Sequence, residues 1–349
     1  MLLLFPLPMV IAANAAVGKR WASHATGILA GLTAGATFLV GALDLRGAGL
    51  VQAGPGGQQT ALDAGIMVTG AIAAVLAARP VRERISRLLP IDPDSPVHAY
   101  ALVLAVILFG TQLSTIVFVD VLAFDQTLPP ISIGDVLAQE TPFLIMALAG
   151  VGLFIRRNAG GAAERLGLTR PAWWQMVLAL AAAGAFFAFI QGADGLSHLW
   201  TPGIASQVDQ TTQHVFGGLN DPIGIAAIAL LPGICEEILF RGALQPRLGL
   251  LVTAVLFTSI HTQYGLSFDA LAVLIVAIGL GLIRKYTNTT TSGVAHITYN
   301  LLAGIGIAGS LVGVAVAVEL GLVALAGYGI WSSRRRMVPA GVAEPPKVS

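Results

Sequence analysis

Apolar runs separated by short polar stretches follow one another along almost the whole chain. Most runs have roughly 17–22 residues, the length that an α-helix needs to cross the hydrocarbon core of a bilayer. This pattern predicts an all-α, polytopic membrane protein with about eleven transmembrane helices. The predicted helices lie near residues 2–18, 26–44, 62–78, 97–118, 141–155, 173–192, 222–240, 249–264, 267–283, 289–308 and 311–331.

The basic residues between these runs predict the orientation of the chain, because cytoplasmic loops of membrane proteins carry an excess of lysine and arginine. Every basic cluster follows an odd-numbered run, and Arg46 alone departs from the pattern. We therefore expect the N-terminus outside the cell and the C-terminus in the cytoplasm. The basic clusters are Lys19–Arg20, Arg79–Arg87, Arg156–Arg170, Arg241–Arg247, Arg284–Lys285 and Arg334–Arg336, whereas the loops after the fourth and sixth runs carry Asp120, Asp125, Asp135, Glu140, Asp194, Asp209 and Asp221.

The composition supports a membrane location and narrows the partners. Hydrophobic residues make up 56% of the 349 residues and charged residues 11%, with a mean hydropathy of +0.81, whereas soluble domains have about 25% charged residues. The formal net charge of +1 gives no reason to expect a nucleic-acid partner. The expected partners are the lipid bilayer and a peptide or membrane-protein substrate. Abundant alanine and glycine, with more arginine than lysine, favour a bacterial plasma membrane.

The seventh run ends in charged residues that a membrane helix does not carry without a reason. The stretch "ICEEILFRGAL" holds Glu236, Glu237 and Arg241, and a charged residue at the centre of a spanning helix costs roughly 2.5–3.5 kcal/mol on insertion scales. Glu237 and Arg241 are four residues apart, a spacing that favours an ion pair and predicts a supporting clamp. Glu236 lies about 100° away from Glu237 around a helix and remains available as a general base.

Two later runs carry side chains at the same four-residue spacing. The stretch "LFTSIHTQ" places Phe257 and His261 on one helix face, and "GVAHITYN" places His296 and Asn300 on another. We predict that these faces line one cavity with Glu236. His261 would orient the water that Glu236 activates, His296 and Asn300 would donate hydrogen bonds to an oxyanion, and Phe257 would pack against His261. A base, a water molecule and oxyanion donors together describe hydrolysis of an acyl bond.

The three motifs read Glu-Glu-x-x-x-Arg as "EEILFR", Phe-x-x-x-His as "FTSIH" and His-x-x-x-Asn as "HITYN", in that order along the chain. Together they resemble the CPBP intramembrane protease family, which includes CAAX prenyl endopeptidases and bacterial bacteriocin-processing homologues. The resemblance covers roughly residues 215–310. It implies that Glu236 and His261 activate water and that His296 and Asn300 bind the oxyanion. It also implies that Glu237 and Arg241 support the geometry of the site.

The resemblance also implies a division of the chain into three parts. Residues 1–200 are expected to form an accessory transmembrane bundle, and residues 201–332 a CPBP-like catalytic transmembrane core. Residues 333–349 are rich in proline and alanine and are expected to form a disordered cytoplasmic tail. The function expected of the core is an intramembrane endopeptidase that cleaves peptide bonds near the cytoplasmic membrane face.

A metal site is an alternative interpretation of the same residues. Glu236, His261 and His296 form a Glu/His/His set of the kind that Zn²⁺ accepts, and such a site would make the protein a metalloendopeptidase. However, the sequence lacks the His-Glu-x-x-His pattern of many zinc proteases. We therefore favour a site without a cofactor, with zinc as the alternative. The single cysteine, Cys235, is expected to be an inert buried thiol.

Two other functions stay open. A polytopic transporter could use the Glu/His/Arg cluster as an ion or proton path, although the polar groups gather in three runs rather than in two related halves. A scaffold with an inactive protease site is the third hypothesis. Glu319, a lone acid in the eleventh run, is expected to make a polar contact between helices rather than to take part in catalysis.

Overall fold

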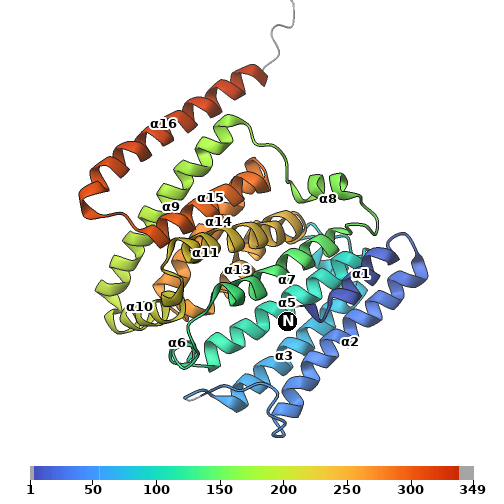
Figure 1. Cartoon of the computed structure of the whole chain (residues 1–349). Helices are drawn as coiled ribbons and strands as arrows, with labels where there is room; N and C mark the ends of the chain where they lie inside the picture. Colours follow the sequence, from blue (N-terminus) through green and yellow to red (C-terminus); the bar gives the residue numbers. More distant parts are fainter. Residues whose placement is uncertain (1–3, 55, 338–349) are drawn as a thin grey trace, which may run out of the picture.

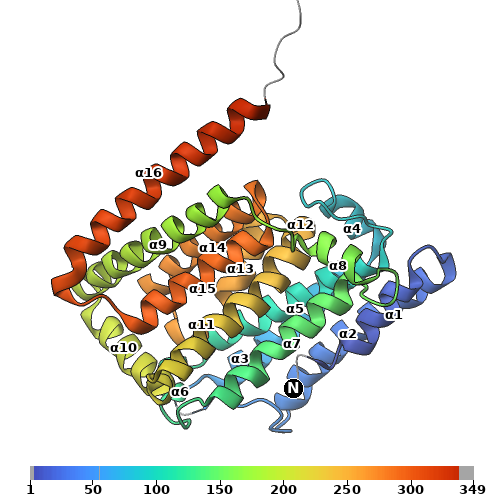
Figure 2. The same ribbon diagram turned by 45° about the horizontal axis from the view of Figure 1, so that its top comes forward.

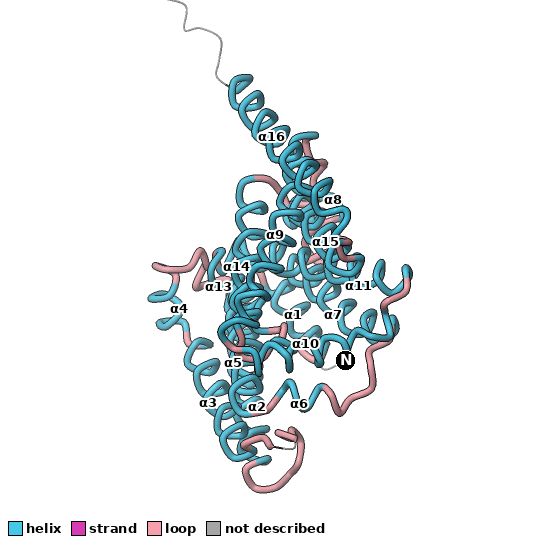
Figure 3. The backbone as a smooth tube through the Cα atoms, turned by 90° about the vertical axis from the view of Figure 1, so that its left-hand side faces the viewer, coloured by secondary structure: helices cyan, strands magenta, loops and turns pink. Residues whose placement is uncertain are grey.

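The computed structural model describes residues 4–54 and 56–337, which form helices joined by loops, with no β-strand (Figure 3). Each of the eleven predicted apolar runs contains a helix, so the all-α prediction is confirmed. These helices are α1 (Leu7–Ala16), α2 (Arg20–Asp44), α3 (Gln59–Ala77), α5 (Pro96–Phe118), α7 (Ile133–Val151), α9 (Trp173–Trp200), α11 (Pro222–Glu236), α13 (Leu250–Ser259), α14 (Phe268–Tyr286), α15 (Thr289–Ile305) and α16 (Val312–Met337).

Shorter elements connect these helices or continue them. A π-helix, η3 (Glu237–Leu244), and α12 (Gln245–Leu248) prolong α11 without a break. The remaining helices lie between the long ones and are α4 (Arg79–Ile85), α6 (Val121–Asp125), α8 (Ala159–Leu166) and α10 (Pro202–Phe216).

Six stretches within the described residues are long and apolar enough to cross a membrane, fewer than the eleven predicted. The helices α1 and α13 have only ten residues each, which is too short for a full crossing. The orientation of the chain stays a prediction. The six candidate spans are His24–Asp44, Gln59–Ala77, Pro96–Phe118, Trp173–Trp200, Pro222–Leu248 and Gly309–Arg335.

The start of α7 differs from the prediction and moves two acidic residues into a helix. Ser132 and Asp135 form a capping box, in which the Asp135 nitrogen donates to Ser132 Oγ at 3.3 Å and the Ser132 nitrogen donates to Asp135 Oδ2 at 2.8 Å. Because this cap satisfies the first turn, the helix begins at Ile133 rather than near residue 141. Asp135 and Glu140, which were predicted in a loop, are therefore helical, and Glu140 is buried.

Other boundaries also differ from the predicted ones. α9 runs to Trp200 and includes Asp194, which was predicted in a loop, whereas α13 ends at Ser259 and leaves His261 just beyond the helix. Residues 333–337 of the predicted tail continue α16. Residues 338–349 of that tail, and residues 2–3 of the first predicted helix, lie outside the described residues.

The helices α2, α3 and α5 form a bundle at one side of the molecule, which we call the N-terminal bundle (Figure 1). Glycines bring its backbones together, as small residues do in membrane helices that lack a hydrophobic driving force for association. A Cβ atom at Gly70 would lie 2.8 Å from the carbonyl oxygen of Ala34, and a Cβ at Gly65 would lie 2.5 Å from Ser114 Oγ. Similar close approaches occur at Gly41 and Gly110.

The helices α7, α9, α11, α13, α14 and α15, with η3 and α12, form the second region, which we call the core. Although α7 and α9 belong to the predicted accessory part, α7 packs against α11 and η3, and α9 packs against α14 and α15. α16 lies along α9 and extends beyond the other helices (Figure 2). Glu319 of α16 packs against Gly184 of α9, so this acid lies between two helices, although its Oε1 has no hydrogen-bond partner among the described residues.

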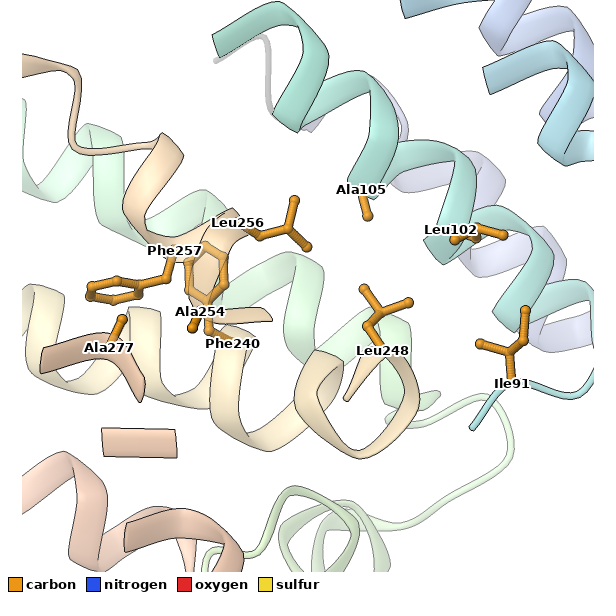
Figure 4. Packing of buried hydrophobic residues seen from close by; sticks show 9 residues of the cluster. All are labelled: Ile91, Leu102, Ala105, Phe240, Leu248, Ala254, Leu256, Phe257 and Ala277. Carbon is orange, nitrogen blue, oxygen red and sulfur yellow. The ribbon is translucent and has the colours of Figure 1, made fainter. Parts of the chain in front are cut away.

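A cluster of buried apolar side chains joins the two regions (Figure 4). Leu102 and Ala105 of α5 belong to the same cluster as Phe240 of η3 and Phe257 of α13. The phenylalanine rings are 5.4 Å apart between centroids and meet edge to face, an arrangement that stabilises aromatic pairs. The N-terminal bundle therefore supports the elements that carry the predicted site residues.

Candidate active site

Gly233 brings α11 and α15 into close contact beside the predicted site. A Cβ atom at Gly233 would lie 3.1 Å from the backbone nitrogen of Ile297 and would also meet the Ile297 side chain. The absence of a side chain at this position lets the two backbones approach. His296 directly precedes Ile297, so this approach places His296 next to the end of α11.

Glu237 lies at the centre of a buried polar cluster. Its Oε1 atom is 3.2 Å from His296 Nδ1 and 3.5 Å from Arg241 Nη1. The side chains of Glu237 and Arg241 are 1% and 0% exposed, so water does not screen their attraction. Arg241 Nη2 also donates to the carbonyl oxygen of Ala277 at 3.3 Å. Such further hydrogen bonds are what offset the cost of taking two charges out of water.

The π-helix η3 holds this cluster against α14. In η3 the backbone N–H of Gln245 reaches the carbonyl oxygen of Phe240, five residues back, and the turn is therefore wider than in an α-helix. Gln245 Nε2 donates to Gly281 O at 2.8 Å, one helical turn beyond the carbonyl that accepts from Arg241. Arg241 of η3 and Gln245, the first residue of α12, thus anchor this segment to two successive turns of α14.

The ring of Phe257 brings the two histidines and the arginine together. Its centroid is 4.7 Å from that of His261 and 5.8 Å from that of His296, and the Arg241 guanidinium carbon is 4.2 Å above the ring. A cation over an aromatic face is attracted by the ring quadrupole. His261 lies two residues past the last residue of α13, but its Nδ1 is 2.9 Å from Phe257 O. This contact keeps His261 near Phe257, as its sequence spacing predicts.

Asn300 is held by a carbonyl that a proline has freed. Pro232 has no N–H, so the carbonyl oxygen of Ile228, four residues earlier in α11, loses its helical donor. Asn300 Nδ2 donates to this oxygen at 3.4 Å. The contact orients Asn300 toward α11. It is compatible with two roles for the amide, a hydrogen bond between helices and the binding of a ligand.

Glu236 is the last residue of α11 and is buried, with an exposed fraction of 5%. Its Oε2 atom has no hydrogen-bond partner among the described residues. A second buried carboxylate, Glu140 of α7, lies near enough for the two charges to interact, and its Oε2 is also without a partner. Buried polar atoms without partners are uncommon in folded proteins, so this pair of carboxylates marks a place where a water molecule or a substrate group can bind.

The donor atoms needed for zinc do not converge at the predicted site. If a metal were bound there, Glu236, His261 and His296 would have to hold it. Within the described part of the chain, the one group of three such residues whose metal-ligating atoms all lie within 4.8 Å of one another is Asp194, His198 and Asp209. In addition, His296 Nδ1 contacts Glu237. The three predicted ligands would therefore have to move before they could share one ion.

Comparison with known proteins gives one match. Residues 218–302 match the family model of type II CAAX prenyl endopeptidase Rce1-like proteins. This match supports the resemblance of the segment to the CPBP/CAAX protease family. No curated protein and no solved structure matches the chain. Since the family acts within membranes and the chain has several apolar helices, the protein is a multi-pass membrane protein.

The Rce1-like segment contains all seven residues that the motifs singled out. The structure brings Glu237, Arg241, Phe257, His261 and His296 into one buried cluster. Two more predicted residues lie at the margins of this cluster. Glu236 is the last residue of α11, and Asn300 lies one turn after His296 on α15.

Hydropathy alone does not reveal the position of Glu140, which lies outside the Rce1-like segment. The apolar run begins at residue 141 and therefore predicts a loop at this carboxylate. The signal that could have found it is the Ser-x-x-Asp pattern at Ser132 and Asp135, which is typical of a helix start. A helix that begins there carries Glu140 two turns inward, where it faces α11.

Proposed function

We propose that the chain is an endopeptidase that hydrolyses peptide bonds within the membrane, close to its cytoplasmic face, in a bacterial plasma membrane. The observation that carries this proposal is the family match over residues 218–302, which spans the three motifs. The buried cluster of Glu237, Arg241 and His296 supports it, because a stability role alone would not require charged groups at this depth.

Glu236 and His261 activate the attacking water in this proposal. A carbonyl oxygen can only accept a hydrogen bond, so the contact between His261 Nδ1 and Phe257 O requires a proton on Nδ1. The neutral ring then has a lone pair on Nε2, which can accept a proton or orient a water molecule. Glu236 has a carboxylate oxygen without a partner and is the general base.

His296 and Asn300 stabilise the oxyanion that forms when water attacks the carbonyl carbon. The Glu237 carboxylate accepts from His296 Nδ1, so its negative charge can balance a protonated ring that donates from Nε2. Asn300 Nδ2 carries two hydrogens, and its bond to Ile228 O uses one. The second hydrogen is available to the oxyanion. Preorganised donors of this kind commonly contribute about 10²–10³-fold to turnover each.

No metal ion takes part in this mechanism, and Glu237 with Arg241 keeps the cluster in place. Treatment of the purified enzyme with a chelator should leave turnover unchanged. Loss of turnover that Zn²⁺ restores would instead support the alternative in which Glu236, His261 and His296 bind zinc.

The substrate class that we propose is a lipidated C-terminus, since the family description names prenyl endopeptidases. The test uses the full chain in phospholipid nanodiscs and a farnesylated peptide that ends in cysteine, two aliphatic residues and one further residue. Mass spectrometry measures release of the C-terminal tripeptide. The Glu236→Gln variant should lose at least 100-fold of the wild-type rate, within the range of roughly 10²–10⁴ for general-base catalysis.

The matched control is Glu164→Gln, which makes the same chemical change at an exposed residue of α8. It should retain wild-type turnover. Equal rates for Glu236→Gln and the wild type would exclude Glu236 as the base. If the wild type cleaves neither this peptide nor an unmodified membrane-protein segment, while vesicles containing it take up protons or ions, the transporter hypothesis replaces the proposal.

A further inference from the structure

A pocket of about 620 Å³ lies between the N-terminal bundle and the core. Helices α1, α2 and α5 form one side, and α7, η3, α12 and α13 form the other. Its volume falls within the roughly 300–1,000 Å³ of typical ligand pockets. Glu236, His261, His296 and Asn300 are not among the residues that line it. The pocket is therefore separate from the candidate active site.

The pocket is elongated along α5. Its lining runs from Val97 to Thr111 on that helix, which corresponds to about 20 Å at 1.5 Å per residue. The hydrocarbon core of a bilayer is about 30 Å thick, so the pocket is long enough for an extended acyl chain that reaches from one surface past the membrane centre.

The walls of the pocket are apolar in effect, because their hydroxyl groups are already bonded. Thr33 Oγ1 donates to Leu29 O at 2.9 Å and is 2.9 Å from the Tyr100 hydroxyl. Thr111 Oγ1 donates to Ile107 O at 2.7 Å. A ligand therefore meets aliphatic and aromatic carbon over most of this length rather than free donors or acceptors.

One end of the pocket has a strongly basic character. Arg156, Arg165 and Arg247 line it near His98 at the start of α5, and Arg157 lies in an adjoining recess. Within the described ranges, none of the four arginines forms an ion pair with a carboxylate. Burial and the charge of Arg247, followed by those of the other arginines, lower the pKa of Arg165 to about 10.

These arginines are fixed in place by neutral groups instead. Arg156 Nε donates to Asn14 Oδ1 at 2.7 Å, and Arg165 Nη1 donates to Gly242 O at 3.1 Å. Arg247 Nε is buried and has no hydrogen-bond partner among residues 4–54 and 56–337. An uncompensated donor on a buried arginine costs free energy, and an anion at this position would remove that cost.

The acidic residues of the adjoining recess, Asp92 and Asp94, do not form ion pairs with these arginines. Asp94 pairs with Arg79, at 2.6 Å between Oδ1 and Nε, and Asp92 Oδ1 accepts from the backbone nitrogen of Asp94 at 2.9 Å. The basic end therefore keeps a surplus of positive charge, on the side of the membrane that the loop charges predict to be cytoplasmic.

We propose that this pocket binds one anionic phospholipid, with the phosphate headgroup at Arg156, Arg165 and Arg247 and an acyl chain along α5. Basic pockets between transmembrane helices on the cytoplasmic side are suited to anionic headgroups. The lipid fills the space between the N-terminal bundle and the core, with its acyl chain against α5 of the bundle and its headgroup against α8 and against α12 of the core.

The test measures lipid binding to the detergent-purified, delipidated full chain by native mass spectrometry. Phosphatidylglycerol and phosphatidylcholine with identical acyl chains are the probes. We expect phosphatidylglycerol to bind at least about tenfold more tightly, because phosphatidylcholine carries the same phosphate but adds a choline cation, which the cluster of arginines repels. Arg247→Gln should remove most of this preference.

Two further variants separate charge from space. Arg87→Gln removes an exposed arginine on the same predicted side, outside the pocket, and should leave both affinities unchanged. Leu104→Trp narrows the apolar part of the pocket and should weaken both lipids alike while the thermal midpoint shows that the protein is folded. The proposal depends on both results. The Arg87→Gln result shows whether the headgroup preference is specific to the pocket arginines, and the Leu104→Trp result shows whether the acyl chain occupies the pocket.

Several outcomes overturn the proposal. Equal binding of the two lipids, or an unchanged preference in Arg247→Gln, would mean that the arginines do not recognise the headgroup. Displacement of the lipid by glycerol phosphate alone would identify a phosphate site without a lipid chain. One-for-one displacement by a farnesylated peptide would make the pocket a substrate site instead.

Discussion

The N-terminal bundle and the core use the same device for close packing but differ in what they bury. In the bundle, Gly70 lets α3 approach α2, and in the core Gly233 lets α11 approach α15. The buried carboxylates at the edge of the bundle, Asp44 and Asp63, lie at helix ends and accept hydrogen bonds from neighbouring backbone or amide groups. In the core, Glu237 and Arg241 are fully enclosed within the helices.

This difference indicates that the N-terminal bundle serves mainly to pack helices together, whereas the core carries the groups that can take part in a reaction. Small residues satisfy most of the packing of membrane helices, and the two buried carboxylates of the bundle lie at its edge with hydrogen-bond partners. Charged groups in the core are costly and have to be paired, so their presence indicates a function beyond stability. Substitutions at matched positions can test whether the two regions differ in this way.

The largest effect is expected from Arg241→Met, which leaves Glu237 as a buried charge with one partner fewer. Removing one member of a buried ion pair typically destabilises a protein by about 3–5 kcal/mol. We expect a large drop in the thermal midpoint in detergent, with loss of peptide hydrolysis. The double variant Glu237→Gln, Arg241→Met should recover much of the stability, since no charge is then unpaired. Equal loss in both variants would contradict the clamp.

A matched pair of glycine substitutions compares the two regions directly. Gly70→Val and Gly233→Val each force a side chain between two helices, and overpacking of this kind costs about 1–3 kcal/mol. Both should lower the thermal midpoint to a similar degree. Only Gly233→Val should abolish hydrolysis per folded molecule, because it moves His296 away from Glu237. If both variants lose activity equally, the site depends on the whole bundle rather than on the local approach of α15.

A smaller effect tests whether Asn300 serves stability or catalysis. Asn300→Ala leaves the Ile228 carbonyl without its donor and should cost about 1 kcal/mol, the usual net contribution of a hydrogen bond. Adding Pro232→Ala supplies a backbone N–H for that carbonyl and should restore the stability. Hydrolysis should stay low in the double variant. Recovery of turnover together with stability would show that Asn300 is only a contact between helices.

The smallest effect is expected outside both clusters, at the exposed pair Arg79–Asp94. Arg79 lowers the pKa of Asp94 through a side-chain hydrogen bond. Any stability from this pair is present above the ordinary pKa of an aspartate and is lost as the pH falls through the lowered value. Because exposed pairs contribute little, Arg79→Gln should leave the thermal midpoint at pH 7 unchanged. A clear drop would mean that the loop between α4 and α5 matters more to the bundle than its exposure indicates.

The sequence predicted the helices of both regions, because hydropathy records the apolar environment that each helix occupies. It also predicted which residues of the core cluster share a face, such as Phe257 with His261, since four-residue spacing follows from helix geometry. It did not predict the position of Glu140, because a single carboxylate at a run boundary looks the same in a loop and in a capped helix. The sequence also did not predict the contact of Asn300 with Ile228. This contact depends on a carbonyl oxygen of another helix, α11, that lacks its helical donor.

The wide turn of η3 also limits how this chain can vary. A π-helical turn holds about one residue more than an α-helical turn, so deletion of a single residue between Glu237 and Leu244 would tighten it into a regular α-helix. A deletion between Glu237 and Arg241 would also bring these two residues from four positions apart to three, which would change the geometry of their ion pair. This segment can therefore accept changes of residue type far more easily than a change of length.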